Sequence, residues 1–356
     1  MKILFVGSYP PPYGGVTTHI KRLTNLLFNY GYNITIFDVV NRDFKKLNQN
    51  ICVIPLRLKY IKLIIQSFST ANIVHIHTSG YGKYWRESLL IILSKISNNK
   101  VVITIHGGLF PEYVSKGSVV SVYYLKFWLK YSNKIIFVND LQKNSVKKYI
   151  LSKEINKFEI IPAYLPEEKD NMINNNLKNS YIKSDKNYFN VLVMGNWLEL
   201  YGLDIFIHAV KKLIDNGISL KAYILIHISS EPDLSYKKKI ESLIESLNLR
   251  DNVTFIPETD DTSSVYRVTD IFVRPTLTDG DAMSIREAIS FGIPVIASDV
   301  CERPKGVVLF KNKDPADLAQ KLQHVLDNFN FSKMHVYDSE QRAYGEKLVQ
   351  IYSNLL

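Results

Sequence analysis

The same local pattern begins twice in this chain: an apolar run typical of a buried strand, then a glycine, a loop and an amphipathic helical stretch. The first copy starts at residues 2–7 (KILFVG) and the second at residues 190–195 (NVLVMG). After each start, short β-branched runs alternate with stretches of helical length and period. Such alternation is typical of parallel sheets covered by helices on both faces. We therefore predict an α/β protein with two doubly wound, Rossmann-like domains.

The domain boundaries follow from where the apolar periodicity stops. Residues 166–187 are polar and show no apolar period, which predicts a linker. We expect an N-terminal domain over residues 1–165, a C-terminal domain over residues 188–331 and a closing helix over residues 332–356, for which packing on the N-terminal domain is one arrangement. The carboxyl ends of the strands of two such domains would face each other across a cleft, where a small ligand is expected to bind.

Nothing in the chain predicts export or a membrane span. The apolar strand pattern follows Met1 directly, without the basic start and long apolar stretch of a signal peptide. The longest apolar run, at residues 89–93, is far shorter than the roughly 20 residues that cross a bilayer. Cys52 and Cys301 lack the spacing of a disulfide scaffold or a zinc site. We expect a cytoplasmic protein with reduced thiols.

Charge is divided unevenly along the chain. Residues 1–165 carry a net charge of +15, from 22 lysines and arginines and 7 acidic residues, and the remainder carries −5, from 22 and 27. A basic half favours an anionic partner such as lipid, polyphosphate or nucleic acid. No nucleic-acid-binding motif accompanies the charge, so we expect no nucleic-acid partner. Solvation of a lysine-rich surface is the alternative explanation.

The stretch from Arg274 to Ala288 concentrates the residues that could carry chemistry. It follows an apolar strand and leads into a helix, so residues 281–284 would place unpaired N–H groups at a helix N-terminus, where phosphate binds readily. Asp279 lies before these amides and Glu287 about one turn inside the helix. Because carboxylates repel phosphate, both are expected to engage sugar and ribose hydroxyls. The alternative is that Asp279 caps the helix and Glu287 is solvated.

Two acidic residues with seven between them, followed by residues 288–299 (AISFGIPVIASD), resemble the Glu-x7-Glu signature of retaining glycosyltransferases of family four. The resemblance implies the two-domain GT-B fold and a nucleotide diphosphate sugar as donor, with no cofactor and no metal. It also implies that Asp279, one methylene shorter than the family's usual glutamate, contacts the donor sugar, and that Glu287 contacts the ribose. The amides between them would bind the diphosphate, namely those of Ala282, Met283 and Ser284.

Two segments of the first half extend the resemblance. Gly14 and Gly15 resemble the family's glycine loop, where the missing β-carbons let the backbone approach the diphosphate. His106, followed by two glycines that would leave room for a ligand, resembles the family's active-site histidine, which touches the transferred sugar. His75 and His77 alternate along another strand, so we expect their imidazoles to face opposite ways and not to share a metal.

The basic pair with which the family neutralises donor phosphate is missing. In the places of the usual Arg and Lys, this chain has Asn196 and Tyr201 at the expected donor site. The positive charge must then come from another residue. Arg274 is the preferred substitute because it ends a strand beside the acidic loop. The other candidates are Arg286, Arg303 and Lys305. For each arginine, a weak surface ion pair is the alternative.

Lysines interleave with aromatic and aliphatic residues in two helical segments of the basic half, residues 58–64 and 123–130. Such helices can lie on an anionic membrane with the apolar face in the interface and the lysines at the headgroups. Core helices with outward lysine stems are the alternative. We expect the basic domain to bind an anionic membrane surface.

These features together predict a hexosyltransferase that moves a sugar, with retention, from a nucleotide diphosphate sugar to a glycan or lipid-linked acceptor. Cell-surface polysaccharide synthesis at the inner face of the cell membrane is the expected setting. The predicted catalytic residues are His106, Asp279 and Glu287. A nucleotide-sugar 2-epimerase of the same fold would instead act on the donor alone. A degenerate relative, for which Asn196 and Tyr201 argue, would bind a nucleotide sugar without turnover.

Overall fold

The structure, a computed structural model, describes residues 1–11, 13–40, 43–81, 84–150, 152–163, 187–227, 233–259, 261–328 and 339–356. The chain forms two compact units. Among the described residues, unit 1 comprises residues 1–11, 15–163 and 339–356, and unit 2 comprises residues 13–14 and 187–328. Residues 166–186 of the predicted linker and residues 332–338 of the predicted closing helix lie outside the described residues.

Unit 1 is built on an eight-stranded sheet in the order β3-β4-β2-β1-β5-β6-β7-β8. Its strands are β1 (Lys2–Gly7), β2 (Asn33–Asp38), β3 (Lys45–Lys46), β4 (Ile51–Pro55), β5 (Ile73–Thr78), β6 (Lys100–Ile105), β7 (Lys134–Phe137) and β8 (Phe158–Ile160). All neighbouring strands are parallel except β3 and β4. The chain starts in the middle of the sheet and builds outward in both directions, so the predicted doubly wound arrangement is confirmed.

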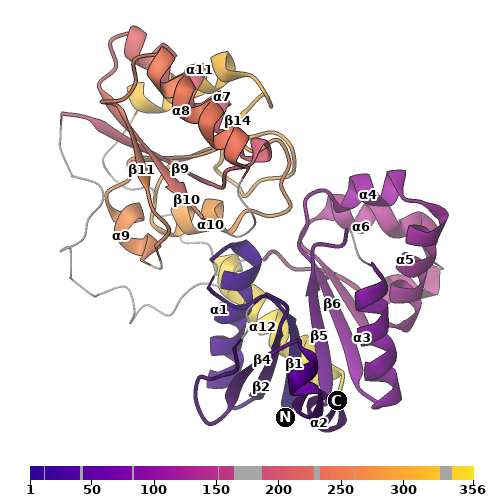
Figure 1. Cartoon of the computed structure of the whole chain (residues 1–356). Coiled ribbons are helices and arrows are strands. Elements are labelled where there is room, and N and C mark those ends of the chain that lie inside the picture. The colour runs from indigo at the N-terminus through magenta and orange to yellow at the C-terminus, as the bar shows by residue number, and fades with distance from the viewer. Residues whose placement is uncertain are drawn as a thin grey trace. The chain divides into compact units, whose positions relative to one another are not determined.

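Helices cover both faces of this sheet (Figure 1). They are α1 (Gly15–Asn29), α2 (Ile61–Thr70), α3 (Tyr84–Ile96), α4 (Phe110–Lys116), α5 (Val119–Tyr131), α6 (Asp140–Val146) and α12 (Ser339–Asn354), with short 3-10 turns at Leu58–Tyr60, Lys147–Tyr149 and Ser152–Lys157. Along β1, Ile3 and Phe5 pack with α1 and α12, whereas Leu4 and Val6 pack with α2, α3 and α5. Successive strand side chains point to opposite faces, which explains why this strand is apolar throughout.

The last helix, α12, is part of unit 1 although it follows unit 2 in the chain. Leu348, Ile351 and Tyr352 are buried in the same cluster as Leu23 and Leu27 of α1. Apolar residues three and four apart lie on one helix face, which gives α12 its buried stripe. The C-terminal helix therefore completes the core of the N-terminal unit.

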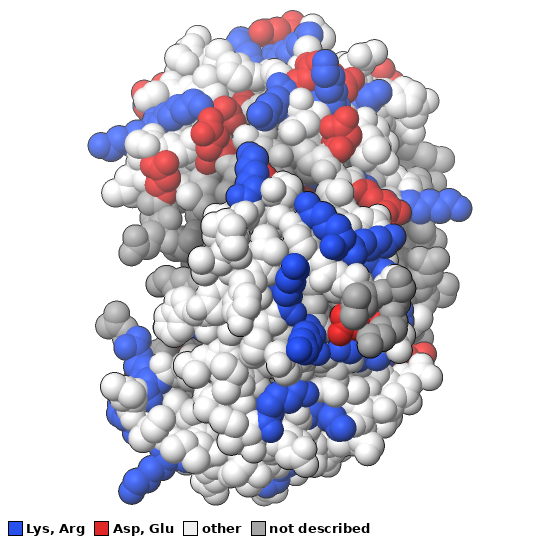
Figure 2. Space-filling model, turned by 90° about the vertical axis from the view of Figure 1, so that its right-hand side faces the viewer, with Lys and Arg blue, Asp and Glu red and all other residues white. Residues whose placement is uncertain are grey.

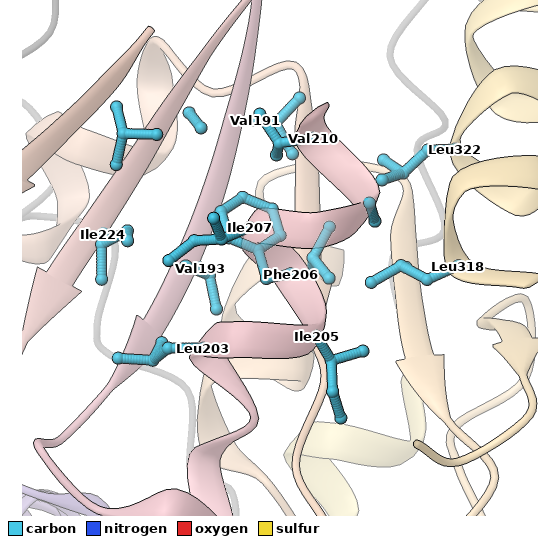
Figure 3. Packing of buried hydrophobic residues seen from close by; sticks show 14 of the residues in the cluster. Val191, Val193, Leu203, Ile205, Phe206, Ile207, Val210, Ile224, Leu318 and Leu322 are labelled. Atoms are coloured by element: carbon cyan, nitrogen blue, oxygen red, sulfur yellow. The ribbon is translucent and has the colours of Figure 1, made fainter. Parts of the chain in front are cut away.

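Unit 2 has a six-stranded parallel sheet in the order β11-β10-β9-β12-β13-β14. Its strands are β9 (Phe189–Gly195), β10 (Leu220–Ile226), β11 (Val253–Ile256), β12 (Ile271–Arg274), β13 (Val295–Ser298) and β14 (Val308–Phe310), and its helices are α7 (Leu203–Asp215), α8 (Leu234–Ser246), α9 (Thr262–Arg267), α10 (Met283–Ser290) and α11 (Pro315–Asp327), with a 3-10 turn at Glu199–Tyr201. Figure 3 shows Val191 and Val193 of β9 packed among side chains of α7 and α11. The carboxyl ends of β9, β12 and β13 lie side by side at one edge of this sheet.

None of the helices in the described part of the chain is both long enough and apolar enough to cross a bilayer.

Candidate active site

The acidic loop of unit 2 is organised around Asp279. Arg274, the last residue of β12, donates to both carboxylate oxygens, from Nε to Oδ2 at 3.0 Å and from Nη2 to Oδ1 at 3.3 Å. Arg303 donates from Nη1 to Oδ2 at 3.0 Å, and the Thr276 hydroxyl donates to the same oxygen at 3.1 Å. We call these four residues the Asp279 cluster. Two guanidinium groups thus share one carboxylate, which leaves the cluster with one net positive charge.

The two arginines of this cluster differ in what else they contact. Arg303 is fixed at the end of β13, because its Nε donates to the Ser298 carbonyl at 3.1 Å. Its side chain is only 2% exposed, against 14% for Arg274. Burial would raise the pKa of the Asp279 carboxyl, but Arg274 and Arg303 outweigh it and hold that pKa well below its usual range. Arg274 is therefore the guanidinium of this cluster that is better placed to meet a ligand.

The loop after β9 supports Arg274. Tyr201 lies with its ring 5.5 Å from the Arg274 guanidinium carbon, so the residue in the place of the family's Lys packs beside the substitute cation. Gly202 has φ +63°, and a β-carbon there would lie 2.1 Å from the Pro275 carbonyl oxygen. Only glycine fits this close approach. Asn196 is 1% exposed, and its Oδ1 accepts from the Trp197 amide at 2.7 Å, so it shapes this loop.

The helix that follows the acidic loop, α10, starts without a side-chain cap. Its N-cap is Ala282, which offers no hydrogen-bonding side chain, so the alternative that Asp279 caps this helix is wrong. The first amides of a helix have no partner within it and attract anions. Ala282, Met283 and Ser284, the residues predicted to bind the diphosphate, occupy this first turn. Arg286 is drawn back to Asp281, with Nε 2.9 Å from Oδ1.

Glu287 has a partner that the sequence did not indicate. Tyr266 of α9 donates its hydroxyl proton to Glu287 Oε2 at 3.0 Å. The Tyr266 ring is 1% exposed and stacks on Phe291 at 5.3 Å between centroids. The alternative of a merely solvated Glu287 is therefore wrong, because a buried hydroxyl orients its carboxylate. No motif links residues 21 positions apart, so only the fold reveals this pair.

Tyr266→Phe should weaken the binding of a bare nucleoside diphosphate by up to about tenfold, the equivalent of the roughly 1.4 kcal/mol that one lost hydrogen bond can cost. The reason is that Glu287, predicted to bind the ribose, loses the donor that orients it. Titration calorimetry would measure the change. Tyr236→Phe is the matched control, since it removes a tyrosine hydroxyl 3.2 Å from Asp204 elsewhere in unit 2. Equal losses in both variants would contradict the assignment of Glu287.

In unit 1, four histidines lie close together between α1 and the sheet. His19 lies on α1, His75 and His77 lie on β5, and His106 follows β6. The prediction that His75 and His77 face opposite ways is wrong: their ring centroids are 4.1 Å apart. Residues two apart in a strand point to the same face, so β5 places both imidazoles on one side of the sheet. Both rings lie on the face that α1 and α12 cover, as does Ile73 two residues earlier.

Hydrogen bonds order this histidine group. His19 Nδ1 is 2.6 Å from the Ala163 carbonyl oxygen, and His77 Nδ1 is 3.1 Å from His106 Nε2. His75 uses both nitrogens, with Tyr352 of α12 at 2.5 Å and with Thr104 at 2.7 Å. Burial lowers the pKa of His19 to about 4 and lowers the pKa of His75, His77 and His106 well below the ordinary value. All four imidazoles are neutral at pH 7.

The glycines singled out in unit 1 differ in their surroundings. A β-carbon on Gly107 would lie 2.2 Å from the Ser79 carbonyl oxygen and 2.3 Å from the Tyr81 ring. The space beside Gly107 is thus filled by protein, so this one of the two glycines after His106 leaves no room for a ligand. Gly15 is the first residue of α1, directly after Gly14, and a β-carbon there would meet nothing within 4 Å. The backbone at the start of α1 is therefore open to close approach.

Known proteins share both this fold and the segment that carries the acidic loop. Residues 188–328 match the family model described as glycosyl transferases group 1. An uncharacterised glycosyltransferase of Methanocaldococcus jannaschii is 23% identical over 94% of this chain and 90% of its own. The O-antigen biosynthesis glycosyltransferase WclY of Escherichia coli is 25% identical over 79% of both chains. The crystal structure of HepE from Anabaena in complex with UDP-glucose superposes with a TM-score of 0.71 at 15% identity, over 100% of this chain and 98% of the other.

Proposed function

Because this chain is a glycosyltransferase of the GT-B fold whose residues 188–328 belong to the group 1 family, we propose that it is a retaining hexosyltransferase. Its donor is a nucleotide diphosphate sugar, and its acceptor is a glycan or lipid-linked sugar of cell-surface polysaccharide, on the cytoplasmic side of the membrane. The O-antigen role named for the Escherichia coli relative and the UDP-glucose in the Anabaena structure support this assignment. The observation that carries it is the cationic Asp279 cluster beside the uncapped start of α10.

In the proposed reaction, unit 2 stabilises the leaving group. The acceptor oxygen bonds to the anomeric carbon as the bond from that carbon to the diphosphate breaks, and the acceptor proton passes to the leaving diphosphate. The first amides of α10 and the Arg274 guanidinium meet the charge that develops on the phosphate oxygens. Glu287 accepts from the ribose, and His106 of unit 1 contacts the transferred sugar. No metal is required, since fixed protein charges and dipoles do the neutralising.

Asp279 has a double role in this proposal. Its Oδ2 already accepts from Arg274, Arg303 and Thr276, whereas Oδ1 accepts from Arg274. A carboxylate oxygen has two lone pairs, and Oδ1 accepts only this one hydrogen bond among the described residues, so it can accept a second from a sugar hydroxyl. We assign Asp279 both to positioning Arg274 and to that single sugar contact.

A nucleotide-sugar-binding protein without turnover is the second candidate, because Asn196 and Tyr201 replace the family's basic pair. The Asp279 cluster weighs against it, since Arg274 and Arg303 bring positive charge to the same strand ends. A 2-epimerase would convert the donor with no acceptor present. Formation of an epimer after incubation with donor alone identifies the epimerase, whereas tight donor binding with no transfer to any acceptor identifies the binding protein.

Donor binding tests the proposal. A thermal-shift series with uridine and guanosine diphosphate sugars should stabilise unit 2 by about 2.7 kcal/mol when the right donor is present at 100 times its dissociation constant. Arg274→Met should weaken that donor by about 2 to 5 kcal/mol, because the diphosphate loses a charged hydrogen-bond partner. Arg250→Met is the control, as Arg250 pairs with Glu245 at an exposed site of unit 2. Unchanged donor affinity in Arg274→Met would remove Arg274 from the site.

We also propose that unit 1 binds an anionic membrane surface, where a lipid-linked acceptor would lie. The helix α2 buries only Ile64 and Phe68, and α5 buries three of its residues, so both present a second, exposed face. Leu58, in the 3-10 turn before α2, and Val119, the first residue of α5, are each 87% exposed. On the face in Figure 2, few acidic side chains appear among the basic and uncharged ones of unit 1.

Changing Lys59, Lys62, Lys126 and Lys130 together to Gln should abolish most vesicle binding, since lysines near an anionic surface contribute about 1 kcal/mol each. Co-sedimentation with phosphatidylserine vesicles at low and high salt measures the loss, because salt screens this attraction. The control changes four exposed lysines of unit 2, namely Lys212, Lys238, Lys311 and Lys313. If wild-type protein ignores anionic vesicles at low salt, or if both variants bind alike, the basic surface serves only solvation.

A further inference from the structure

Three imidazoles converge in unit 1, and only one of them has a part in the proposed transfer. His19, His77 and His106 each present a ring nitrogen within 4.8 Å of the other two. Their ring centroids lie 5.1 to 5.5 Å apart. They come from α1, β5 and the loop after β6, three elements packed within one unit. The arrangement therefore does not depend on how the two units are placed.

The hydrogen-bond partner of His19 determines which nitrogen of the His19 ring can bind a metal ion. A carbonyl oxygen only accepts, so the ring must donate from Nδ1 to Ala163 across the 2.6 Å contact. In the neutral ring, Nε2 then carries the lone pair. Histidines that bind metals almost always donate their second nitrogen to a carbonyl or carboxylate in this way, which fixes the tautomer. His19 is thus prepared as a ligand.

His77 and His106 share a single proton between two nitrogens 3.1 Å apart. Two neutral imidazoles can form only one hydrogen bond at this contact, with one donating and the other accepting. The remaining nitrogen of His77, Nε2, is buried and has no hydrogen-bond partner in the described part of the chain, while the residue is 7% exposed. An ion that bonds to both facing nitrogens replaces the hydrogen bond between them, and each ring then carries its proton on its other nitrogen.

The ligand chemistry selects the ion. Neutral imidazoles suit Zn²⁺, Co²⁺, Ni²⁺ and Cu²⁺, whereas Mg²⁺ and Ca²⁺ prefer oxygen. Two nitrogens bound to one tetrahedral Zn²⁺ at 2.0–2.1 Å lie about 3.3 Å apart, close to the 3.1 Å between His77 and His106. His106 is partly exposed, so an ion can enter and a water can occupy the fourth position.

We infer that His19, His77 and His106 form a binding site for one divalent first-row transition ion, and that this ion inhibits transfer. The inhibition, unlike the binding, rests on the proposed function, because the ion takes His106 away from the sugar. Such a site is compatible with a reaction that needs no metal, because the ion would block His106 and take no part in the transfer.

Zinc tests the binding without any assay of transfer. Titration calorimetry of the full chain with Zn²⁺ should give one site, and zinc-edge X-ray absorption of the wild-type complex should show three imidazole nitrogens at about 2.0–2.1 Å. His19→Gln and His77→Gln should each weaken binding by more than the roughly 10- to 100-fold that loss of an outer partner costs. His208→Gln, an exposed histidine of α7, should leave the affinity unchanged.

Each outcome decides the inference. Fewer than three imidazoles in the absorption spectrum, or equal affinity in the wild type and both site variants, would overturn it. Because the spectrum is taken on wild-type protein, it remains decisive even if a variant fails to fold. With binding established, Zn²⁺ should inhibit transfer and EDTA should restore it. Zinc that binds without inhibiting would leave the site intact and instead contradict the role of His106.

Discussion

Replacing Asp279 by alanine should destabilise unit 2 by about 3–5 kcal/mol, because removing one partner of a buried ion pair leaves an uncompensated charge. Here one substitution removes the carboxylate partner of two guanidinium groups. They belong to Arg274 and Arg303, whose side chains are 14% and 2% exposed. Urea unfolding followed by hydrogen exchange would show the loss at the amides of β9, β12 and β13. The amides of β5 and β6 in unit 1 should keep their protection.

Two control variants separate charge from shape. Asp279→Asn keeps the size of the side chain but not its charge, so it should lose most of the same stability. Asp215→Ala breaks an exposed pair with Lys211 and should cost less than about 1 kcal/mol. If Asp279→Ala costs no more than Asp215→Ala, the Asp279 cluster is a screened surface contact and cannot position Arg274.

Unit 1 should lose stability steeply as pH falls below about 6.5, the ordinary pKa of histidine. Burial lowers the folded pKa of His19 to about 4 and lowers the pKa of His75, His77 and His106 well below the ordinary value. In this window the unfolded chain therefore binds more protons than the folded chain. The stabilisation that comes from burying these histidines in their neutral form is complete above pH 6.5. It is lost as pH falls toward their pKa values in the folded protein.

The expected slope is large. Each of these four histidines contributes up to about 1.4 kcal/mol per pH unit, so together they contribute up to about 5 to 6 kcal/mol per unit. Burial raises the pKa of Glu87, so the folded protein takes up a proton there before the unfolded chain does as pH falls. This proton uptake stabilises the folded state and offsets part of the loss caused by the histidines at the acidic end of the range. Urea unfolding between pH 7 and 5.5 should show the slope in the amides of β5 and β6, and His77→Gln should reduce it by about a quarter. An identical slope in that variant would contradict the account.

The fold was predictable because the signal is repeated along the chain. Ile3 and Phe5 face one layer of helices and Leu4 and Val6 face the other, so a continuous apolar run had to be a strand buried on both sides. The glycine–loop–helix start recurs in both halves, which predicted two units of the same kind. Local pattern carries this information, and no long-range contact is needed to read it.

The candidate site was predictable only where its parts are close in sequence. Arg274 and Asp279 lie five residues apart, and their proximity followed from the strand end. Arg303 reaches the same carboxylate from 24 residues away, and Tyr266 reaches Glu287 from 21 away. Those contacts arise from which strands the sheet places side by side, which no spacing records.

The histidine group shows a second kind of limit. His75 and His77 were expected to face opposite ways, although a period of two places them together. His19 joins them because α1 packs across the same face of the sheet, 58 residues away from His77 in the chain. A sequence motif can therefore single out His106 while leaving its neighbours unnamed.

The most direct test of the central claim is transfer itself, measured with the wild-type chain, a panel of labelled nucleotide diphosphate sugars and a lipid-linked acceptor fraction from cells that assemble surface polysaccharide. A glycosylated product whose anomeric configuration matches the donor is expected, formed equally with and without EDTA. No product is expected from folded His106→Ala. A chain that binds no nucleotide sugar, or that turns the donor into an epimer with no acceptor present, would contradict it.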